Sequence, residues 1–165
     1  MNPVYSVVIP CYNEEASIAE THRRLSLVMA GMGEAYELVY VNDGSRDQTP
    51  ALLDGLADGD SHVRVLHFAA NRGHQAAVSA GLDYAAGDAV VIIDADLQDP
   101  PEVIPRMAER WKAGIQVVYG KRRSREGETG FKKWSARAYY RLLRRIAGDI
   151  FPEDTGDFRL VDRRV

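Results

Sequence analysis

Apolar and polar positions are grouped along the chain in blocks that predict strands separated by helices. Short runs rich in β-branched residues, such as 4–10 and 89–95, are apolar on both faces, which is typical of strands in a buried parallel sheet. Between these runs, apolar residues recur at helical spacing, and glycines follow the ends of several stretches. The predicted elements are, in chain order, strand 4–10, helix 14–31, strand 36–43, helix 48–58, strand 63–69, helix 73–86, strand 89–95, helix 101–113 and strand 115–121. This order predicts an α/β fold with a mostly parallel sheet flanked by helices.

Polar sequences follow each of the five predicted strands. They read PCYNE, NDGS, NRGHQ, DADLQD and GKRR. In open α/β sheets, ligands bind at the carboxyl ends of the strands, which meet at one edge of the sheet. We therefore expect these five sequences to form a single site.

The DADLQD sequence is the strongest candidate for a metal site. Asp94 and Asp96 place two carboxylates at the end of an apolar strand, and Gln98 can add a neutral oxygen. Mg²⁺ and Mn²⁺ favour such oxygen ligands and take further ligands from substrate phosphates. The alternative is that these acids are turn residues at the strand exit. We favour that alternative for Asp99, as a cap of the next helix, and a metal for the Asp94–Asp96 pair.

Residues after the first two strands can bind a nucleotide. Asp43 can accept hydrogen bonds from a base N–H or from ribose hydroxyls, Tyr12 can pack on a base, and Glu14 can reach the ribose. The alternatives are an Asp-Gly turn at 43–44, with Asp47 as N-cap of the next helix, and an acidic first helical turn at Glu14. Neither a GxGxxG dinucleotide sequence nor a GxxxxGK[ST] phosphate loop occurs.

The NRGHQ sequence after the third strand offers contacts to a phosphate. Arg72 can bind a phosphate directly, and Gly73 allows the backbone to approach closely. For His74 we favour a hydrogen-bonding role at the start of the helix over a catalytic one.

Length and composition exclude several classes of protein. A chain of 165 residues fits one domain, and a single cysteine, Cys11, excludes an intramolecular disulfide. The N-terminal sequence becomes polar at PCYNEE, too soon for a signal peptide. No stretch approaches the ~20 apolar residues that a membrane-spanning helix needs.

Basic residues are concentrated in one segment. Residues 121–147 carry ten Lys and Arg side chains and two Glu, a net charge of +8 in a chain whose total is −3. From Phe131 to Ala147, apolar residues recur at helical spacing with cations on the other faces. Such a helix can lie on an anionic membrane surface, or it can pack on the sheet with a solvated basic face. Nucleic acid is not expected as a partner, because the rest of the chain is acidic.

Five motifs together resemble those of a known family. In order they are VVIPCYNEE, VNDGSRDQT, NRGHQAAVSAGLDYAAGD, DADLQDPPE and GDFRLVDR. They resemble the inverting family 2 glycosyltransferases of the GT-A fold, and within that family the polyprenyl-phosphate glycosyltransferases, from residue 4 to the end.

The resemblance implies roles for matching residues. The nucleotide would be held by Pro10, Tyr12, Glu14, Asp43 and Asp94. The metal, Mg²⁺ or Mn²⁺, would be held by Asp94, Asp96 and Gln98. The acceptor phosphate would be met by Arg122, Lys132 or Lys133, and Ser135. Asp157 would be a catalytic base or a positioning acid beside the catalytic Asp96.

The function expected from this resemblance is transfer of a sugar from a UDP- or GDP-sugar to a polyprenyl phosphate at the cytoplasmic face of the plasma membrane. The alternatives are a family 2 enzyme acting on a saccharide hydroxyl and a nucleotide-binding module without activity. We expect residues 1–165 to form one GT-A catalytic domain, cut from a longer protein whose membrane-anchoring helices are absent here. The sequence leaves a homo-oligomer open, as it does the identity of the sugar.

Overall fold

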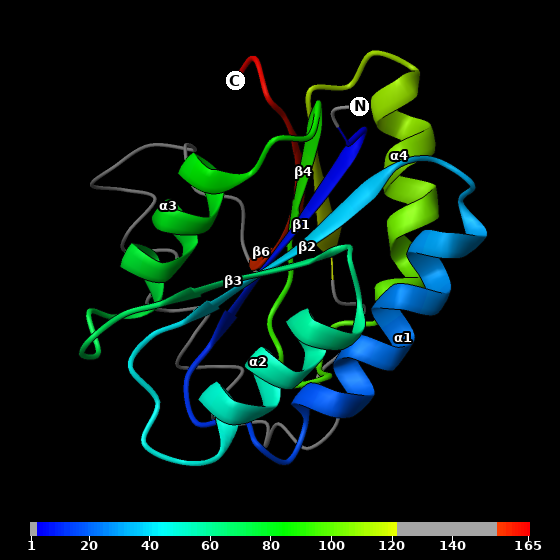
Figure 1. Cartoon of the computed structure of the whole chain (residues 1–165). Coiled ribbons are helices and arrows are strands. Elements are labelled where there is room, and N and C mark those ends of the chain that lie inside the picture. Colours follow the sequence, from blue (N-terminus) through cyan, green and yellow to red (C-terminus); the bar gives the residue numbers. More distant parts are fainter. Residues whose placement is uncertain (1–2, 122–154) are drawn as a thin grey trace, which may run out of the picture. The chain divides into compact units, whose positions relative to one another are not determined.

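A computed structural model of the chain describes residues 3–121 and 155–165 (Figure 1). Contacts divide the chain into two compact units, one formed by Met1–Tyr119 with Asp157–Val165 and the other by Gly120–Gly156. Most of the second unit lies outside the described residues, so the fold below is that of the first. The expectation of one domain over 1–165 stays a prediction.

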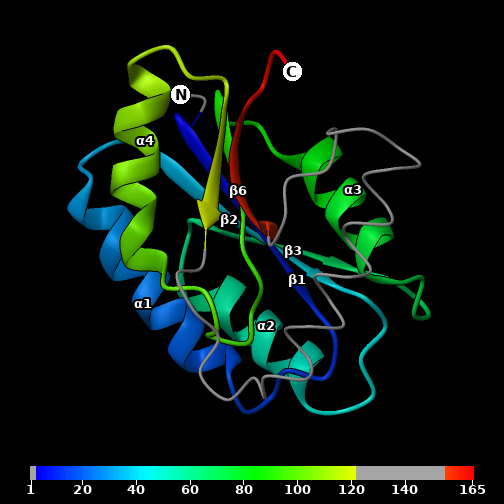
Figure 2. The ribbon, with the colours of Figure 1, turned by 180° about the vertical axis from the view of Figure 1, so that it is seen from behind.

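A six-stranded sheet forms the centre of the first unit (Figures 1 and 2). Its strands are β1 (Tyr5–Cys11), β2 (Tyr36–Asn42), β3 (Val63–His67), β4 (Ala89–Ile92), β5 (Val117–Lys121) and β6 (Thr155–Asp162). They lie in the order β3-β2-β1-β4-β6-β5. The pairs of β1 with β2, β1 with β4 and β2 with β3 are parallel, whereas β6 runs antiparallel to β4. The predicted mostly parallel α/β fold is confirmed.

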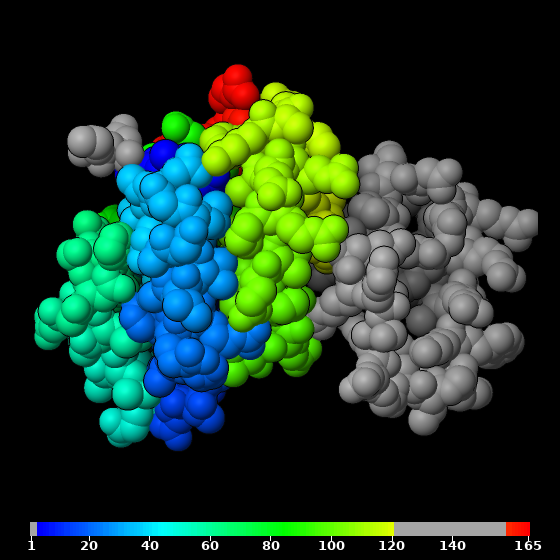
Figure 3. All heavy atoms as spheres, turned by 90° about the vertical axis from the view of Figure 1, so that its right-hand side faces the viewer, coloured from blue at the N-terminus to red at the C-terminus, as the bar shows by residue number. Residues whose placement is uncertain are grey.

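Helices cover both faces of the sheet. They are α1 (Ile18–Gly31), α2 (Thr49–Gly59), α3 (His74–Tyr84) and α4 (Ile104–Lys112), with a short 3₁₀ turn, η1 (Pro101–Val103), before α4. α3 packs on one face, and α1, α2 and α4 lie on the other. Figure 3 looks onto α1 (blue) and α4 (yellow-green), which lie side by side. None of the helices in the described ranges has the length and apolar character needed to span a bilayer.

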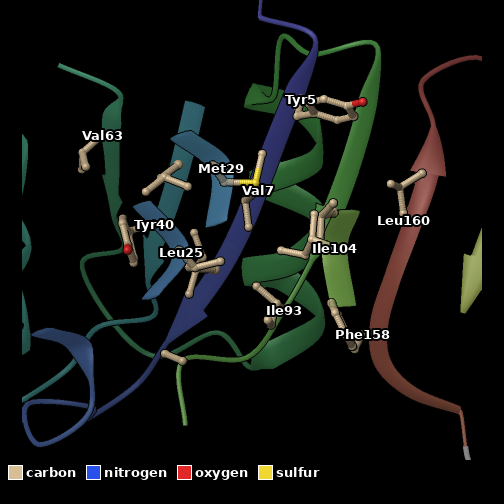
Figure 4. Packing of buried hydrophobic residues seen from close by; sticks show 14 of the residues in the cluster. Tyr5, Val7, Leu25, Met29, Tyr40, Val63, Ile93, Ile104, Phe158 and Leu160 are labelled. Atoms are coloured by element: carbon tan, nitrogen blue, oxygen red, sulfur yellow. The ribbon is translucent and has the colours of Figure 1, made fainter. Parts of the chain in front are cut away.

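Alternate side chains along the strands pack into two hydrophobic cores, one on each face of the sheet. Val7 and Ile9 of β1 pack with Leu25 and Met29 of α1, whereas Val8 packs under α3. Figure 4 shows the larger core, in which residues from β1, α1, α4 and β6 meet. Full burial of each such side chain contributes about 1.5–3 kcal/mol, so both faces of the central strands hold the sheet in place. The strand ends therefore form a rigid edge.

Several predicted element boundaries differ from the structure, and the differences at the carboxyl edge of the sheet matter most for the site. α1 begins at Ile18 rather than at residue 14, and β4 ends at Ile92 rather than at residue 95. Gln48 holds the N-cap position of α2, but Asp47 makes the expected capping bond, since its Oδ1 accepts from Thr49 N–H. Before α1, the N–H groups of Ser17 and Ile18 both donate to Glu14 O, so a turn precedes the helix.

Asp99 lies in the turn between β4 and η1. Pro100 occupies the N-cap position of η1, and Asp99 lies one residue earlier with only 3% of its surface exposed. Asp99 is thus a residue of the turn after β4, as the alternative reading expected, but Pro100 and not Asp99 holds the N-cap position of η1.

Candidate functional site

A pocket of about 290 Å³ lies where β1, β2 and β4 end and α3 begins. Eight of its lining residues were singled out from the sequence: Pro10, Tyr12, Glu14, Asp43, Gly73, His74, Asp94 and Asp96. The structure thus brings together segments that follow four different strands, as the parallel topology predicted. The sequence did not single out Cys11, Asn71, Ala77 and Ala95, which also line the pocket. They are small or neutral residues without a chemical signature.

The turn after β4, residues 93–100, carries the two carboxylates. The ladder with β1 ends at the hydrogen bond from Ile93 N–H to Val8 O. Beyond it, the hydroxyl of Thr21 in α1 donates to Ala95 O at 2.8 Å. Thr21 is buried, so a side chain from α1 fixes the peptide between Asp94 and Asp96. This role could not be predicted from the sequence, because Thr21 and Ala95 are 74 positions apart.

The same turn has an unusual backbone at Leu97. Its φ of 63° lies in the left-handed region, which a leucine adopts only at a cost of order 1–3 kcal/mol. Asp96 Oδ1 accepts a hydrogen bond from Gln98 N–H at 3.0 Å across this turn. The Gln98 side chain is exposed and is not part of the pocket lining. Of the three predicted metal ligands, the pocket therefore unites two.

Two carboxylates in one pocket fit a hard divalent cation. Within the described residues, no cluster of three or more His, Cys, Asp or Glu forms a complete metal cage. Mg²⁺ and Mn²⁺ do not need one, since they keep several waters and take oxygens from substrate phosphates. The Asp94 side chain is 32% exposed, which leaves it open to the pocket. The residues present fit the predicted metal.

Asp43 has a structural role that the sequence did not indicate. It is 3% exposed, and its Oδ1 and Oδ2 accept hydrogen bonds from Arg72 N–H at 2.6 Å and Gly73 N–H at 2.9 Å. Both bonds fix the loop between β3 and α3. Charge-assisted bonds of this kind are about twice as strong as neutral ones. Asp43 lines the pocket and at the same time holds the opposite wall of it.

Gly44, next to Asp43, allows Ala70 and Asn71 of the loop before α3 to approach its backbone closely. Its φ is 66°, and a Cβ built on it would lie 2.5 Å from Ala70 C and from Asn71 N. Any side chain here would collide with backbone atoms. The alternative reading of 43–44 as an Asp-Gly turn therefore describes the backbone correctly, but the turn also shapes the pocket.

The loops after β1 and β2 are joined by hydrogen bonds from side chains to backbone. We call residues 12–17 the β1 loop and residues 43–48 the β2 loop. Glu14 N–H donates to Thr49 Oγ1 at 2.8 Å. Glu15 N–H donates to Asp47 Oδ2 at 3.2 Å, and Glu15 Oε2 accepts from Gln48 N–H at 2.9 Å. These bonds hold the β1 loop against the β2 loop and the start of α2, and α1 begins after them, at Ile18.

The N-terminus of α3 forms another wall of the pocket. Gly73, His74 and Ala77 line it, and Gly73 has a φ of 92°. His74 is the first residue of α3, and its Nε2 lies 3.9 Å from Asp94 Oδ1. The first N–H groups of a helix and its dipole favour an anion such as a phosphate. His74 thus lies where we expected, at the helix start, and also faces the acidic pair.

Cys11 lies at the base of the pocket but is not a candidate nucleophile. It is 2% exposed, and its thiol donates to Ile9 O at 3.4 Å. Burial, reinforced by the Glu14 and Asp94 carboxylates, raises the pKa of the Cys11 thiol well above its ordinary value. A thiol that stays protonated is a weak nucleophile, so the chemistry of this pocket belongs to its carboxylates.

Of the remaining predicted residues, one lies in β6 and the others lie outside the described residues. Ile92 pairs with Arg159, so Asp157 lies two residues further along β6, in the direction of the turn after β4. The predicted acceptor-phosphate residues Arg122, Lys132, Lys133 and Ser135, and the basic helix of 131–147, lie outside the described residues. Their roles stay predictions.

Comparison with known proteins gives relatives along nearly the whole chain. Residues 6–165 match the family described as glycosyl transferase family 2. The glycosyltransferase YkcC of Bacillus subtilis is 53% identical over 161 residues, 98% of this chain and 50% of that protein. The bactoprenol glucosyl transferase of Shigella phage SfV is 41% identical over 160 residues, 97% of this chain and 52% of that protein. The chain thus spans about half the length of these curated relatives.

A solved structure is similar as well. Glucosyl-3-phosphoglycerate synthase from Mycobacterium tuberculosis, in complex with Mn²⁺, UDP and phosphoglyceric acid, aligns with a TM-score of 0.70 and 26% identity. The alignment covers 98% of this chain and 56% of that one. This likeness confirms the predicted GT-A fold.

Proposed function

The chain belongs to glycosyl transferase family 2, and from this premise we propose that it transfers a sugar from a nucleotide sugar to a polyprenyl phosphate. The observation that carries the proposal is the pocket in which Asp94 and Asp96 face Tyr12, Glu14 and the start of α3. A base, a ribose and a diphosphate need, respectively, a flat contact, hydroxyl acceptors and a cationic environment. The pocket offers the first two through Tyr12 and Glu14, and Asp94 and Asp96 would supply the third by holding a divalent cation.

The nucleoside diphosphate would bind across the carboxyl ends of β1, β2 and β4. Tyr12 is 43% exposed, so its ring is available to a base. Glu14 would accept from the ribose hydroxyls, and Asp43, whose oxygens already accept from Arg72 and Gly73 N–H, would offer its remaining lone pairs to a base N–H. The diphosphate would lie toward Gly73 and the first turn of α3, where the backbone N–H groups and the helix dipole favour negative charge.

A divalent cation would be held by Asp94 and Asp96. Mg²⁺ or Mn²⁺ bound there would neutralise charge on the departing diphosphate. The mycobacterial synthase structure described above contains Mn²⁺ with UDP, which supports this part of the proposal. Gln98 is exposed and outside the pocket lining, so it would take part only after its side chain turned toward the pocket.

The acceptor decides how much help the reaction needs from a base. In the proposed step, an oxygen of the lipid phosphate forms a bond to the anomeric carbon, and the bond from that carbon to the nucleoside diphosphate breaks with inversion. A phosphate monoester, with a second pKa of about 6, is largely dianionic at neutral pH. It carries no proton that must be removed, so Asp157 would orient groups rather than act as a base.

The location of the acceptor follows from its chemistry. A polyprenyl phosphate lies in a membrane, and the phage relative is named for bactoprenol, which supports this acceptor. The basic segment 121–147 would contact the lipid phosphate and the anionic surface at the cytoplasmic face. Arg122, Lys132, Lys133 and Ser135 are the residues proposed for the phosphate contact.

Binding of the sugar donor is tested by calorimetry with UDP and with GDP, each in Mn²⁺ and in EDTA. We expect one of the two nucleotides to bind, and to bind more tightly in Mn²⁺. Metal-independent binding would remove the cation from the proposal. The absence of binding by either nucleotide would contradict the proposed donor site.

The acceptor is tested by offering labelled UDP- and GDP-sugars together with a polyprenyl phosphate in detergent. We expect label in the lipid fraction and none after the polyprenyl phosphate is replaced by the polyprenol, which lacks the phosphate. Transfer to an added oligosaccharide instead would support the alternative of a saccharide hydroxyl acceptor.

A further inference from the structure

Asn13 lies between two pocket residues but does not itself line the pocket. Tyr12 precedes it and Glu14 follows it in the β1 loop, and both of these face the pocket. Asn13 is exposed and has a φ of 56°, in the left-handed region. Asparagine and glycine adopt this conformation most readily. The backbone at Asn13 therefore sets the directions in which Tyr12 and Glu14 leave the loop.

Two reciprocal hydrogen bonds connect Asn13 to the β2 loop. Asn13 N–H donates to Ser45 Oγ at 2.9 Å, and Asn13 Oδ1 accepts from Arg46 N–H at 2.9 Å. The backbone N–H and the side-chain oxygen of Asn13 are thus bonded to adjacent residues of the β2 loop, Ser45 and Arg46. Such a pair fixes orientation as well as distance.

The β2 loop is itself anchored to the sheet at this point. Ser45 N–H donates to Asn42 Oδ1 at 3.0 Å. Asn42 is the last residue of β2, is 3% exposed, and its Nδ2 lies 3.0 Å from His67 Nδ1 at the end of β3. A chain of contacts therefore runs from β3 through Asn42 and Ser45 to Asn13, so Asn13 is held by the rigid sheet and not by another free loop.

We infer that Asn13 is a positioning residue of the nucleotide pocket, which holds Tyr12 and Glu14 in binding orientation without touching the ligand. This inference rests on the proposed function, because it takes the ligand to be a nucleoside diphosphate. Ordering a loop on binding costs free energy. The two Asn13 hydrogen bonds order the β1 loop before the ligand arrives, and the affinity for the nucleotide depends on them.

A merely structural role for these bonds makes a different prediction. Glu15 provides the matched comparison, because its Oε2 also accepts a backbone N–H of the β2 loop, from Gln48, yet Glu15 does not line the pocket. If the bonds only stabilise the fold, loss of either side chain should affect nucleotide binding in proportion to the loss of stability. If Asn13 positions its neighbours, its loss should affect binding more.

The test measures UDP and GDP affinity in Mn²⁺, and the denaturation midpoint, for four variants of the chain. Asn13→Gly keeps the backbone conformation accessible and removes the Oδ1 acceptor. Asn13→Asp keeps an acceptor in the same place, Asn13→Ala loses both features, and Glu15→Ala is the matched control. Amide hydrogen exchange at Arg46, without ligand, reports directly on the bond that Asn13 accepts.

We expect nucleotide affinity to fall about 10-fold in Asn13→Gly and further in Asn13→Ala, since one net hydrogen bond is commonly equivalent to up to about one factor of ten. Asn13→Asp should stay within about 3-fold of the wild type, and Glu15→Ala likewise. Arg46 N–H should exchange faster in Asn13→Gly and not in Asn13→Asp.

Two results overturn the inference. One is wild-type affinity in Asn13→Gly, and the other is an equal loss in Asn13→Gly and Glu15→Ala at equal loss of stability. If the wild type binds neither nucleotide, the proposed donor site is wrong and the positioning role is wrong with it. A wild type that binds while Asn13→Gly binds equally well contradicts only the role of Asn13.

Discussion

Two acidic loops of similar composition surround the pocket, and they use their carboxylates differently. In the β2 loop, Asp43 and Asp47 direct all four carboxylate oxygens at backbone N–H groups of other segments. In the turn after β4, Asp94 and Asp96 are partly exposed and line the pocket. The acids of the β2 loop thus use every oxygen for the backbone, whereas Asp96 in the turn after β4 accepts one backbone N–H, from Gln98, and stays partly exposed.

The origin of the difference lies in the neighbours of each loop. The β2 loop lies between the β1 loop and the loop after β3, both of which have N–H groups outside regular structure, such as those of Glu15, Arg72 and Gly73. The turn after β4 is held instead by a hydroxyl from α1, at the carbonyl of Ala95. That contact fixes the backbone and does not occupy either carboxylate.

The largest effect should come from Asp96→Ala. We expect Mn²⁺-dependent nucleotide affinity to fall about 100-fold or more, because loss of a second-shell partner of a metal alone typically costs 10- to 100-fold. The fold should be unaffected, since Asp96 is partly exposed and lies beyond β4. Calorimetry and chemical denaturation measure the two quantities. Asp83→Asn, an exposed acid near the other end of α3, is the control and should change neither.

Asp43→Asn, unlike Asp96→Ala, should lower the stability of the fold. We expect a loss of about 2 kcal/mol in the free energy of unfolding, because the amide keeps one acceptor and directs an NH₂ group at a buried N–H. Urea denaturation measures it. Unchanged stability with weaker nucleotide binding would mean that Asp43 acts as a ligand contact alone, and the contrast between the two loops would disappear.

Thr21→Val should have a smaller effect that appears mainly in metal binding. Valine keeps the shape and removes the donor to Ala95 O, which costs about 1 kcal/mol of stability. The concentration of Mn²⁺ at half-maximal nucleotide binding should rise about 3- to 5-fold, and Thr21→Ser should restore it. An unchanged Mn²⁺ midpoint in the valine variant would show that Ala95 O does not position the carboxylates.

The smallest effect should be in the acid dependence of the β2 loop. Burial raises the pKa of Asp47, but hydrogen bonds from Thr49 and from the Glu15 backbone lower it by more, so it lies below its ordinary 3.8. The stabilisation is present above that value and is lost as the pH falls through the lower pKa of the folded state. Asp47→Asn should therefore be less stable than the wild type at about pH 5, and the difference should shrink toward about pH 3. Urea midpoints across this range measure it, and a constant difference would contradict the assignment.

The sequence by itself determined the sheet, the edge that carries the site and most of the pocket. Apolar runs such as 89–95 predict buried strands, because a strand covered on both faces needs apolar side chains at consecutive positions. Parallel strands place their carboxyl ends together, so Tyr12, Asp43 and Asp94 had to lie near one another. The motifs also gave the family, which the match over residues 6–165 confirms.

Only the tertiary structure decided how the polar residues are paired. That Asp43 would bind the loop before α3, that Thr21 would reach Ala95, and that β6 would lie antiparallel beside β4 depend on which segments meet in space. Periodicity reports the face of an element that is buried and carries no information about hydrogen-bond partners far away in the sequence. In the sequence, a loop carboxylate that will bind a cation looks identical to one that will accept a backbone N–H. The two have the same chemistry, and only their surroundings in the folded protein differ.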